Sequence, residues 1–202
     1  MKKLFALLLP ILLFSLLPAQ NLGGGLILGF NASQVDGDAV GGFRQFGLSG
    51  GGFVTYRIHE QMHLQPEILY DQLGSRDRGG FFSLRTTHIS IPVLFAYTLP
   101  VDLGSGYQDL ILEAGPVVGV LLAARDNNSG ANYTSTYTNP DFRAVVGGEY
   151  RFSDRWAFHM RWGYSIVSFL RSGSRPIYLS INAPGLYHHY VQFSLRRYLS
   201  RR

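Results

Sequence analysis

Two short motifs in this chain match the patterns of known catalytic sites, and the first is a zinc-protease pattern. Residues 59–63 read His-Glu-Gln-Met-His, or H-E-x-x-H. That chemistry needs both histidines on one face of a helix, with the glutamate as general base. No helical period of apolar residues surrounds the motif, and Pro66 follows three residues after it. The pattern therefore falls in a turn and the start of a strand, and we predict no metal there.

The second motif is Gly-Leu-Ser-Gly-Gly at residues 47–51, which matches the G-x-S-x-G nucleophile elbow. An elbow needs a sharp turn from a strand into a helix, whereas this stretch continues as a strand to Ile58. We therefore interpret its glycines as a face that allows close packing. An enzyme with serine and histidine at the rim of a barrel is the alternative. Ser165, His159 and His188 are its candidates, although no spacing selects them.

The elements that position these side chains are strands, because apolar residues recur with a period of two. In the segment from residue 155 to 168, one face is apolar and aromatic, and it comprises Trp156, Phe158, Met160, Trp162, Tyr164 and Ile166. The other face mixes small, polar and charged residues. Successive side chains of a strand point to opposite faces. The same split recurs in seven further segments, which predicts eight strands of about 9–14 residues each.

Two features indicate that the apolar face points outward, toward lipid. The opposite face is rich in Gly, Ser, Ala and Thr, which suits the narrow interior of an eight-stranded barrel. The apolar face carries Tyr and Trp near strand ends, as in the aromatic girdles of outer-membrane barrels. Long predicted connections alternate with short ones: 34–45, 74–83, 125–140 and 169–186 are long, and 59–61, 99–108 and 153–154 are short. We predict an all-β fold, an eight-stranded antiparallel up-and-down transmembrane β-barrel with long external loops.

The composition and the first twenty residues bound the remaining possibilities. The chain has 202 residues and no cysteine, which excludes disulfides and cysteine-bound metals. Its only lysines, Lys2 and Lys3, precede an apolar run of 14 residues, the pattern of a secretory signal peptide. We expect a signal peptide at 1–20 and a barrel domain at 21–202. Removing the signal lowers the net charge from +5 by the two lysine charges to +3, so nucleic acid is not an expected partner.

Several short segments resemble the PorT-like outer-membrane β-barrel family of the Bacteroidetes. They are GFNAS at 29–33, LQPEILY at 64–70, ISIPVL at 89–94, LEAGP at 112–116 and DFRAVVG at 141–147. The resemblance covers essentially all of residues 22–199. It implies an eight-stranded barrel in the cell outer membrane, with no enzymatic activity and no cofactor. The namesake of the family is implicated in the secretion of proteins across the outer membrane.

The parity of the strands also predicts what fills the barrel. It sends charged residues of both signs into the lumen: Glu67, Glu113, Glu149, Arg57, Arg151, Arg161 and Arg196. An eight-stranded interior is just wide enough for side chains, so these groups must meet one another. Unpaired, they would carry a large desolvation penalty. We therefore predict a plugged lumen. The alternative is a pathway for protons or ions.

Recognition is expected in the external loops, because loops on a rigid scaffold tolerate variation. Tyrosine and arginine supply contact area and charge at binding surfaces, and the candidates are Tyr133, Tyr137, Arg171, Arg175 and Tyr178. We expect a non-enzymatic monomer in the outer-membrane lipid, with a structural or interaction role. Proteins of secretion or envelope assembly are its expected partners. The alternative function is a ligand-binding or lipid-modifying barrel with a site at the external rim.

Overall fold

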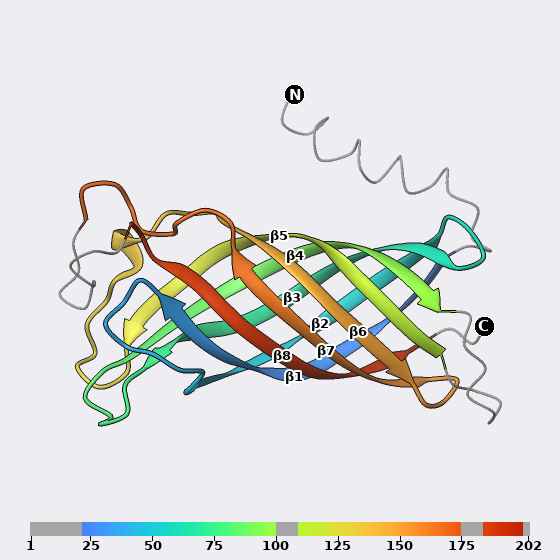
Figure 1. Cartoon of the computed structure of the whole chain (residues 1–202), viewed down its shortest axis with the longest axis horizontal. Coiled ribbons are helices and arrows are strands. Elements are labelled where there is room, and N and C mark those ends of the chain that lie inside the picture. Colours follow the sequence, from blue (N-terminus) through green and yellow to red (C-terminus); the bar gives the residue numbers. More distant parts are fainter. Residues whose placement is uncertain (1–21, 100–108, 175–183, 200–202) are drawn as a thin grey trace, which may run out of the picture.

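The structure, a computed structural model, describes residues 22–99, 109–174 and 184–199 and contains a closed barrel of eight strands (Figure 1). The expected signal peptide at 1–20 and most of the expected turn at 99–108 lie outside these residues. In chain order the elements are β1 (Leu22–Asp36), β2 (Gln45–Arg57), β3 (Met62–Arg76), β4 (Ser83–Leu99), β5 (Asp109–Asp126), the short 3-10 helix η2 (Thr134–Thr136), β6 (Asp141–Arg151), β7 (Trp156–Ser165) and β8 (Tyr187–Tyr198).

Each strand pairs with the next in antiparallel register, and β8 pairs with β1 to close the sheet. The closing seam runs from the pair Gly25–Tyr198 to the pair Asp36–Tyr187. Closure satisfies the backbone groups of every strand, which lipid requires. The predicted fold class is confirmed. Among the described residues, no helix is long and apolar enough to cross a membrane.

The alternation predicted from the sequence has the predicted direction. On β7 the outward Phe158 and Trp162 are 47% and 43% exposed, whereas the inward His159 and Arg161 are buried. The chain puts most of its large apolar residues outside and most of its polar residues inside, although two apolar clusters, which include Phe53 and Leu94, also lie in the lumen. That arrangement is stable only when the outer face contacts lipid instead of water.

Four strands are longer than predicted. β1 and β3 have 15 residues, β4 has 17 and β5 has 18, against the expected 9–14. The loop predicted at 74–83 shrinks accordingly to residues 77–82. The sequence prediction ended each strand where apolar residues stop. Backbone pairing continues past that point, because polar residues such as Ser75 and Arg76 still form the ladder with β4.

The two ends of the barrel differ (Figure 1). The turns at residues 58–61 and 152–155 lie at the same end as the start of β1 and the end of β8, and the longer loops gather at the other end. Outer-membrane barrels have short periplasmic turns and longer extracellular loops. We therefore call the long-loop end the external end.

Two glycines make room in the lumen for large side chains. A Cβ atom added to Gly119 would lie 2.1 Å from Nη2 of Arg143, and one added to Gly163 would lie 2.3 Å from Cζ of Tyr190. Both contacts are far below van der Waals distance. The small residues on the inward face therefore shape the space that Arg143 and Tyr190 occupy.

Candidate functional site

A cluster of charged side chains fills the middle of the lumen, and Arg196 of β8 is its hub. Its Nη1 donates to Oε2 of Glu113 at 3.0 Å and to Oε2 of Glu149 at 2.7 Å. Its Nη2 donates to Oε1 of Glu67 at 2.9 Å. These four side chains are each at most 1% exposed. One guanidinium thus joins carboxylates from β3, β5 and β6.

Two more arginines complete this midlumen cluster. Nη2 of Arg161 donates to Oε2 of Glu67 at 2.8 Å and lies 3.3 Å from Oε1 of Glu113. Nε of Arg151 lies 4.0 Å from Oε1 of Glu149. The cluster therefore balances three carboxylates with three guanidinium groups, of which that of Arg151 is partly exposed. Its members are Glu67, Glu113, Glu149, Arg151, Arg161 and Arg196.

The structure brings together six of the seven charged residues that parity assigned to the lumen, and the seventh, Arg57, lies elsewhere. Arg57 ends β2 and is exposed at the short-turn end, where it pairs in register with His63. Its parity is inward, as predicted. However, it lies beyond the level at which the barrel wall encloses a side chain, so it belongs to the periplasmic rim.

A second polar cluster lies below the external mouth of the barrel, and the sequence analysis did not single it out. Nδ1 of His188 bonds to Oδ2 of Asp141 at 3.0 Å, and the ring of His88 meets that of His188 edge-on at a centroid distance of 5.2 Å. Nε of Arg143 is 3.1 Å from Oδ2 of Asp141, and all these residues are buried. We call His88, Asp141, Arg143 and His188 the mouth cluster. Their inward parity was visible in the sequence, but their meeting depends on the register of β4, β6 and β8.

Three residues of the mouth cluster have the chemistry of metal ligands. One ligand atom each from His88, Asp141 and His188 lies within 4.8 Å of the others, and imidazole and carboxylate groups suit zinc. The guanidinium of Arg143 lies against the same carboxylate, and its positive charge opposes a second cation there. The geometry therefore favours a hydrogen-bonded ion pair over a metal centre.

The lumen also contains two chains of hydroxyl, imidazole and carboxylate, the groups of a nucleophilic triad. In the first, Thr86 and Asp141 bond to the two nitrogens of His188 at 3.1 and 3.0 Å. The second places the ring of His159 between Ser194 and Glu113, at 3.0 and 2.8 Å.

All six side chains of these two chains are buried. Ser165, a further enzymatic candidate, donates to Asp141 at 3.2 Å and is also buried. The enzymatic alternative required convergence at the external rim. These groups converge inside the lumen instead, where their hydrogen bonds hold the carboxylates of Asp141 and Glu113 in place.

The two sequence motifs lie where the sequence predicted. Residues 59–63 span the turn after β2 and the start of β3, and residues 47–51 lie inside β2. Neither position has the helix that its catalytic pattern requires.

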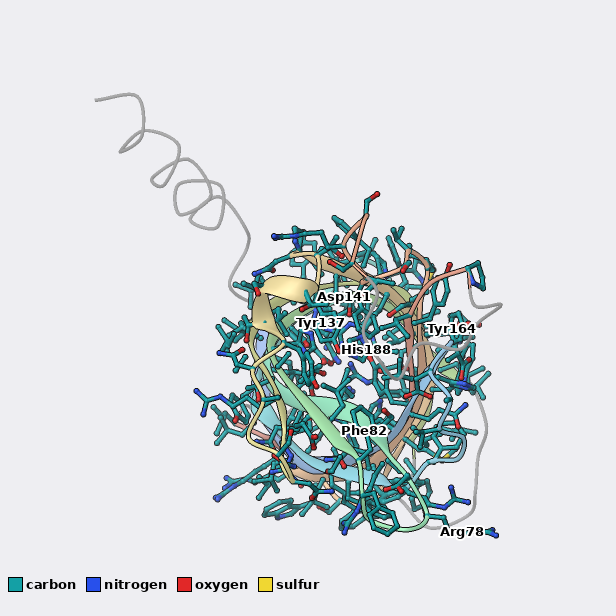
Figure 2. All side chains as sticks on the ribbon, turned by 90° about the vertical axis from the view of Figure 1, so that its left-hand side faces the viewer. Arg78, Phe82, Tyr137, Asp141, Tyr164 and His188 are labelled. Atoms are coloured by element: carbon teal, nitrogen blue, oxygen red, sulfur yellow. The ribbon has the colours of Figure 1, made fainter. Side chains whose placement is uncertain are left out.

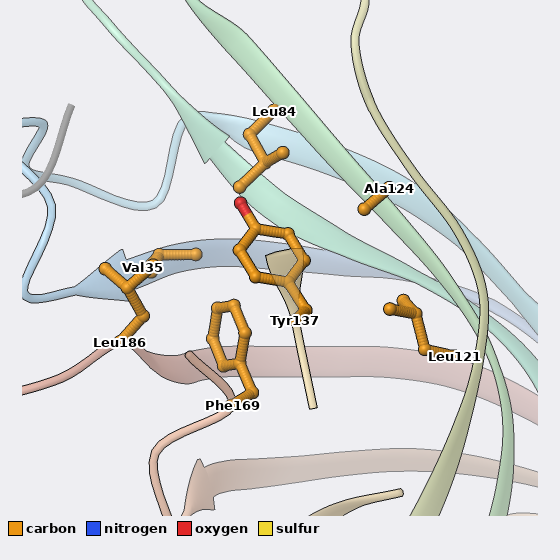
Figure 3. Packing of buried hydrophobic residues seen from close by; sticks show 7 residues of the cluster. All are labelled: Val35, Leu84, Leu121, Ala124, Tyr137, Phe169 and Leu186. Carbon is orange, nitrogen blue, oxygen red and sulfur yellow. The ribbon is translucent and has the colours of Figure 1, made fainter. Parts of the chain in front are cut away.

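An apolar cluster packs at the external end of the barrel, next to the mouth cluster (Figures 2 and 3). The rings of Tyr137 and Phe169 meet edge-on at 5.0 Å, and Phe169 stacks on the ring of His188 at 4.0 Å. We call this cluster the mouth cap. Its buried members are Val35, Leu84, Leu121, Ala124, Tyr137, Phe169 and Leu186.

Some of the loop residues predicted to contact a partner pack in the mouth cap or against it. Tyr137 is only 1% exposed, and its ring packs inside the mouth cap, so the predicted contact of this side chain with a partner does not fit the structure. Tyr133 packs partly buried against the cap, whereas Arg171 is exposed. Arg175 and Tyr178 lie outside the described residues.

Two aspartates in loops at the external end have shifted pKa values. Burial raises the pKa of Asp38 to about 6, although the backbone N–H of Val40 donates to the carboxylate at 2.9 Å. A hydrogen bond from the backbone N–H of Phe82 lowers the pKa of Asp77, at an oxygen–nitrogen distance of 3.0 Å. Asp77 is therefore charged at neutral pH and shapes the loop between β3 and β4.

Comparison with known proteins agrees with this architecture. The model of the family described as "Outer membrane protein beta-barrel domain" matches residues 18–171. The chain belongs to this family. It is thus an integral β-barrel protein of the outer membrane. No curated protein matches the chain.

Solved structures of outer-membrane barrels share the fold. Ail, the attachment invasion locus protein of Yersinia pestis, is 9% identical with a TM-score of 0.50, over 88% of this chain and 98% of that one. Neisserial surface protein A is 11% identical with a TM-score of 0.51, over 86% and 96%. At such low identity, the likeness concerns the fold alone.

Proposed function

We propose that this protein works from its external surface, as a closed barrel that carries recognition loops and conducts no solute. The observation that carries this proposal is that the lumen is blocked at two levels. The midlumen cluster ties β3, β5 and β6 to β8 through Arg196, and the mouth cap packs seven buried apolar residues at the external end. Leaving one partner of a buried ion pair without its counter-charge costs roughly 3–5 kcal/mol, so a solute that separated these groups would meet a large barrier.

The loop between β3 and β4 presents the side chains best suited to recognition. Phe81 is 87% exposed, and Arg78 beside it is also exposed at the edge of the molecule (Figure 2). Asp77 fixes the base of this loop through two bonds with Phe82. Aromatic residues and arginine are enriched at protein interfaces. An exposed phenylalanine on a fixed loop therefore supports a protein partner.

The remaining parts of the proposal concern the partner and the route to the membrane. The PorT-like sequence resemblance supports a partner among the proteins of secretion or envelope assembly. The closed sheet and its apolar outer face support a chain that acts as a monomer surrounded by outer-membrane lipid. We further propose that residues 1–20 direct export and are removed, which leaves the barrel domain at 21–202.

Site-specific photo-crosslinking in cells tests the recognition surface. A photoreactive amino acid at Phe81 is expected to trap a discrete envelope protein. The same group at Phe152, which is 48% exposed at the opposite end, is the matched control and is expected to trap none. Identical products from both positions, or none from Phe81, would refute recognition by this loop. Separately, steady and large single-channel conductance of the wild-type protein would refute the closed lumen.

A further inference from the structure

Three arginines meet on the outer face of the barrel, at the external ends of β3, β4 and β5. Arg85 lies directly opposite Arg125 in the β4–β5 register. Arg76 pairs with Ser83, and Gly74 pairs with Arg85; Arg76 is therefore the diagonal neighbour of Arg85, with no intervening side chain at Gly74. We call Arg76, Arg85 and Arg125 the rim arginines.

The rim arginines point away from the lumen. Leu84 and Thr86, on either side of Arg85, are fully buried and face inward. Ala124 and Asp126 are buried on either side of Arg125, which is itself exposed. Alternation along each strand therefore places the guanidinium groups on the lipid-facing surface.

This arrangement is electrostatically unfavourable in the isolated chain. Like charges directly opposite each other on neighbouring strands destabilise the pair. Within the described residues, none of the three forms an ion pair, and Nε of Arg85 is buried without a hydrogen-bond acceptor.

The acids nearest in sequence to the rim arginines are engaged elsewhere. Asp77 bonds to the backbone of Phe82, and Asp126 accepts from Ser129 and from the backbone of Ser83. Three cations thus lie close in register, and no acid of the described part of the chain forms an ion pair with them.

The height of the rim arginines on the barrel indicates which anion they meet. The register pair Ile89–Val120 belongs to the outward apolar band, and the pair Arg85–Arg125 lies four residues farther along β4. Four residues span about 13 Å of strand, or about 9 Å along the membrane normal at a tilt of ~45°. That distance carries the guanidinium groups out of the hydrocarbon and to the level of the lipid headgroups.

We propose that the rim arginines bind the phosphate groups of a lipid headgroup in the external leaflet. Guanidinium groups pair with phosphate through two parallel N–H···O bonds, and a phosphate between Arg85 and Arg125 turns their repulsion into a bridge. The lipid-facing orientation and the position directly above the apolar band select a lipid phosphate over a soluble anion. This site borders the loop between β3 and β4, but the proposal does not rest on recognition by that loop.

Native mass spectrometry of the folded barrel in a neutral detergent tests this proposal. The wild type is titrated with bisphosphorylated lipid A, with its dephosphorylated counterpart, and with inorganic phosphate. We expect retention of the phosphorylated lipid alone. The double variant Arg85→Gln/Arg125→Gln should bind it about tenfold more weakly or worse, as expected for the loss of charge-assisted hydrogen bonds.

Matched controls separate this site from general charge and folding effects. Arg57→Gln/Arg155→Gln removes two exposed charges at the opposite end of the barrel and should bind like the wild type. Arg85→Lys/Arg125→Lys keeps the charge and the fold but loses the planar fork, so its affinity should be intermediate.

Three results would overturn the proposal. They are equal retention of both lipids by the wild type, equal weakening by the two glutamine double variants, and arginine-dependent binding of inorganic phosphate without the lipid. The last result would identify a site for a soluble anion instead.

Discussion

Replacing Glu113 by alanine should destabilise the barrel by roughly 3–5 kcal/mol, the usual cost of stranding a buried ionic partner. The Glu113 carboxylate accepts from Arg196 at 3.0 Å and from His159 at 2.8 Å, and it lies 3.3 Å from Nη2 of Arg161. Without Glu113, three guanidinium groups face two carboxylates, so the midlumen cluster carries one uncompensated positive charge. A cavity the size of the lost side chain adds to the penalty.

Urea unfolding of the refolded barrel measures this loss, with the fluorescence of Trp156 and Trp162 as the signal. Glu60→Ala is the matched control, because Glu60 is exposed in the turn between β2 and β3 and its loss should change stability by less than about 0.5 kcal/mol. The double variant Glu113→Ala/Arg161→Met restores charge balance and should lose less than the sum of its single variants. A Glu113→Ala loss below about 1 kcal/mol would refute the reasoning that buried charge balance holds the lumen together.

Two further predictions concern the external end. Phe169→Ala should cost about 3–5 kcal/mol, because it empties the centre of the mouth cap, yet the midlumen cluster should keep single-channel conductance at the wild-type level. Urea unfolding and planar-bilayer recording check the two parts, and a conducting variant would show that the cap alone closes the barrel. The raised pKa of Asp38, about 6 against an ordinary 3.8, means that the folded loop holds its proton more tightly than the unfolded chain does. Stability of the loop at 37–44 should therefore fall as pH rises from about 4 to about 6 and level off above. Asp38→Asn should remove this dependence in hydrogen exchange; an unchanged pH profile would contradict the assignment.

The sequence predicted the strands and their two faces well, because a barrel in lipid imposes an alternation that every strand must obey. It also predicted that Glu67, Glu113 and Arg196 face inward, since parity alone decides the face. Parity does not give height, which is why Arg57 was placed in the lumen although it lies at the rim. Which inward side chains contact each other depends on the register of strands that are distant in the chain. The sequence alone therefore could not predict the contact of His188 with Asp141.

Loop residues were the least predictable. Tyr137 is of a residue type that is common at binding surfaces, and only the folded loop shows that its ring is buried in the mouth cap. The opposite holds for Phe81, which was not among the predicted recognition residues although it lies in one of the predicted long connections, 74–83. In both cases, whether the aromatic side chain is buried or exposed depends on whether the loop turns it toward the lumen or toward the solvent.

The position of Arg196 on the last strand has a consequence for how the barrel assembles. Its carboxylate partners stand 129, 83 and 47 residues earlier in the chain, so these contacts are non-local and need the last strand in place. Until β8 arrives, the midlumen cluster holds three acids and only two arginines. Pairing of β8 with β1 therefore also brings in the arginine that balances the charge of the midlumen cluster. A barrel that lacks β8 is destabilised by the unbalanced carboxylates.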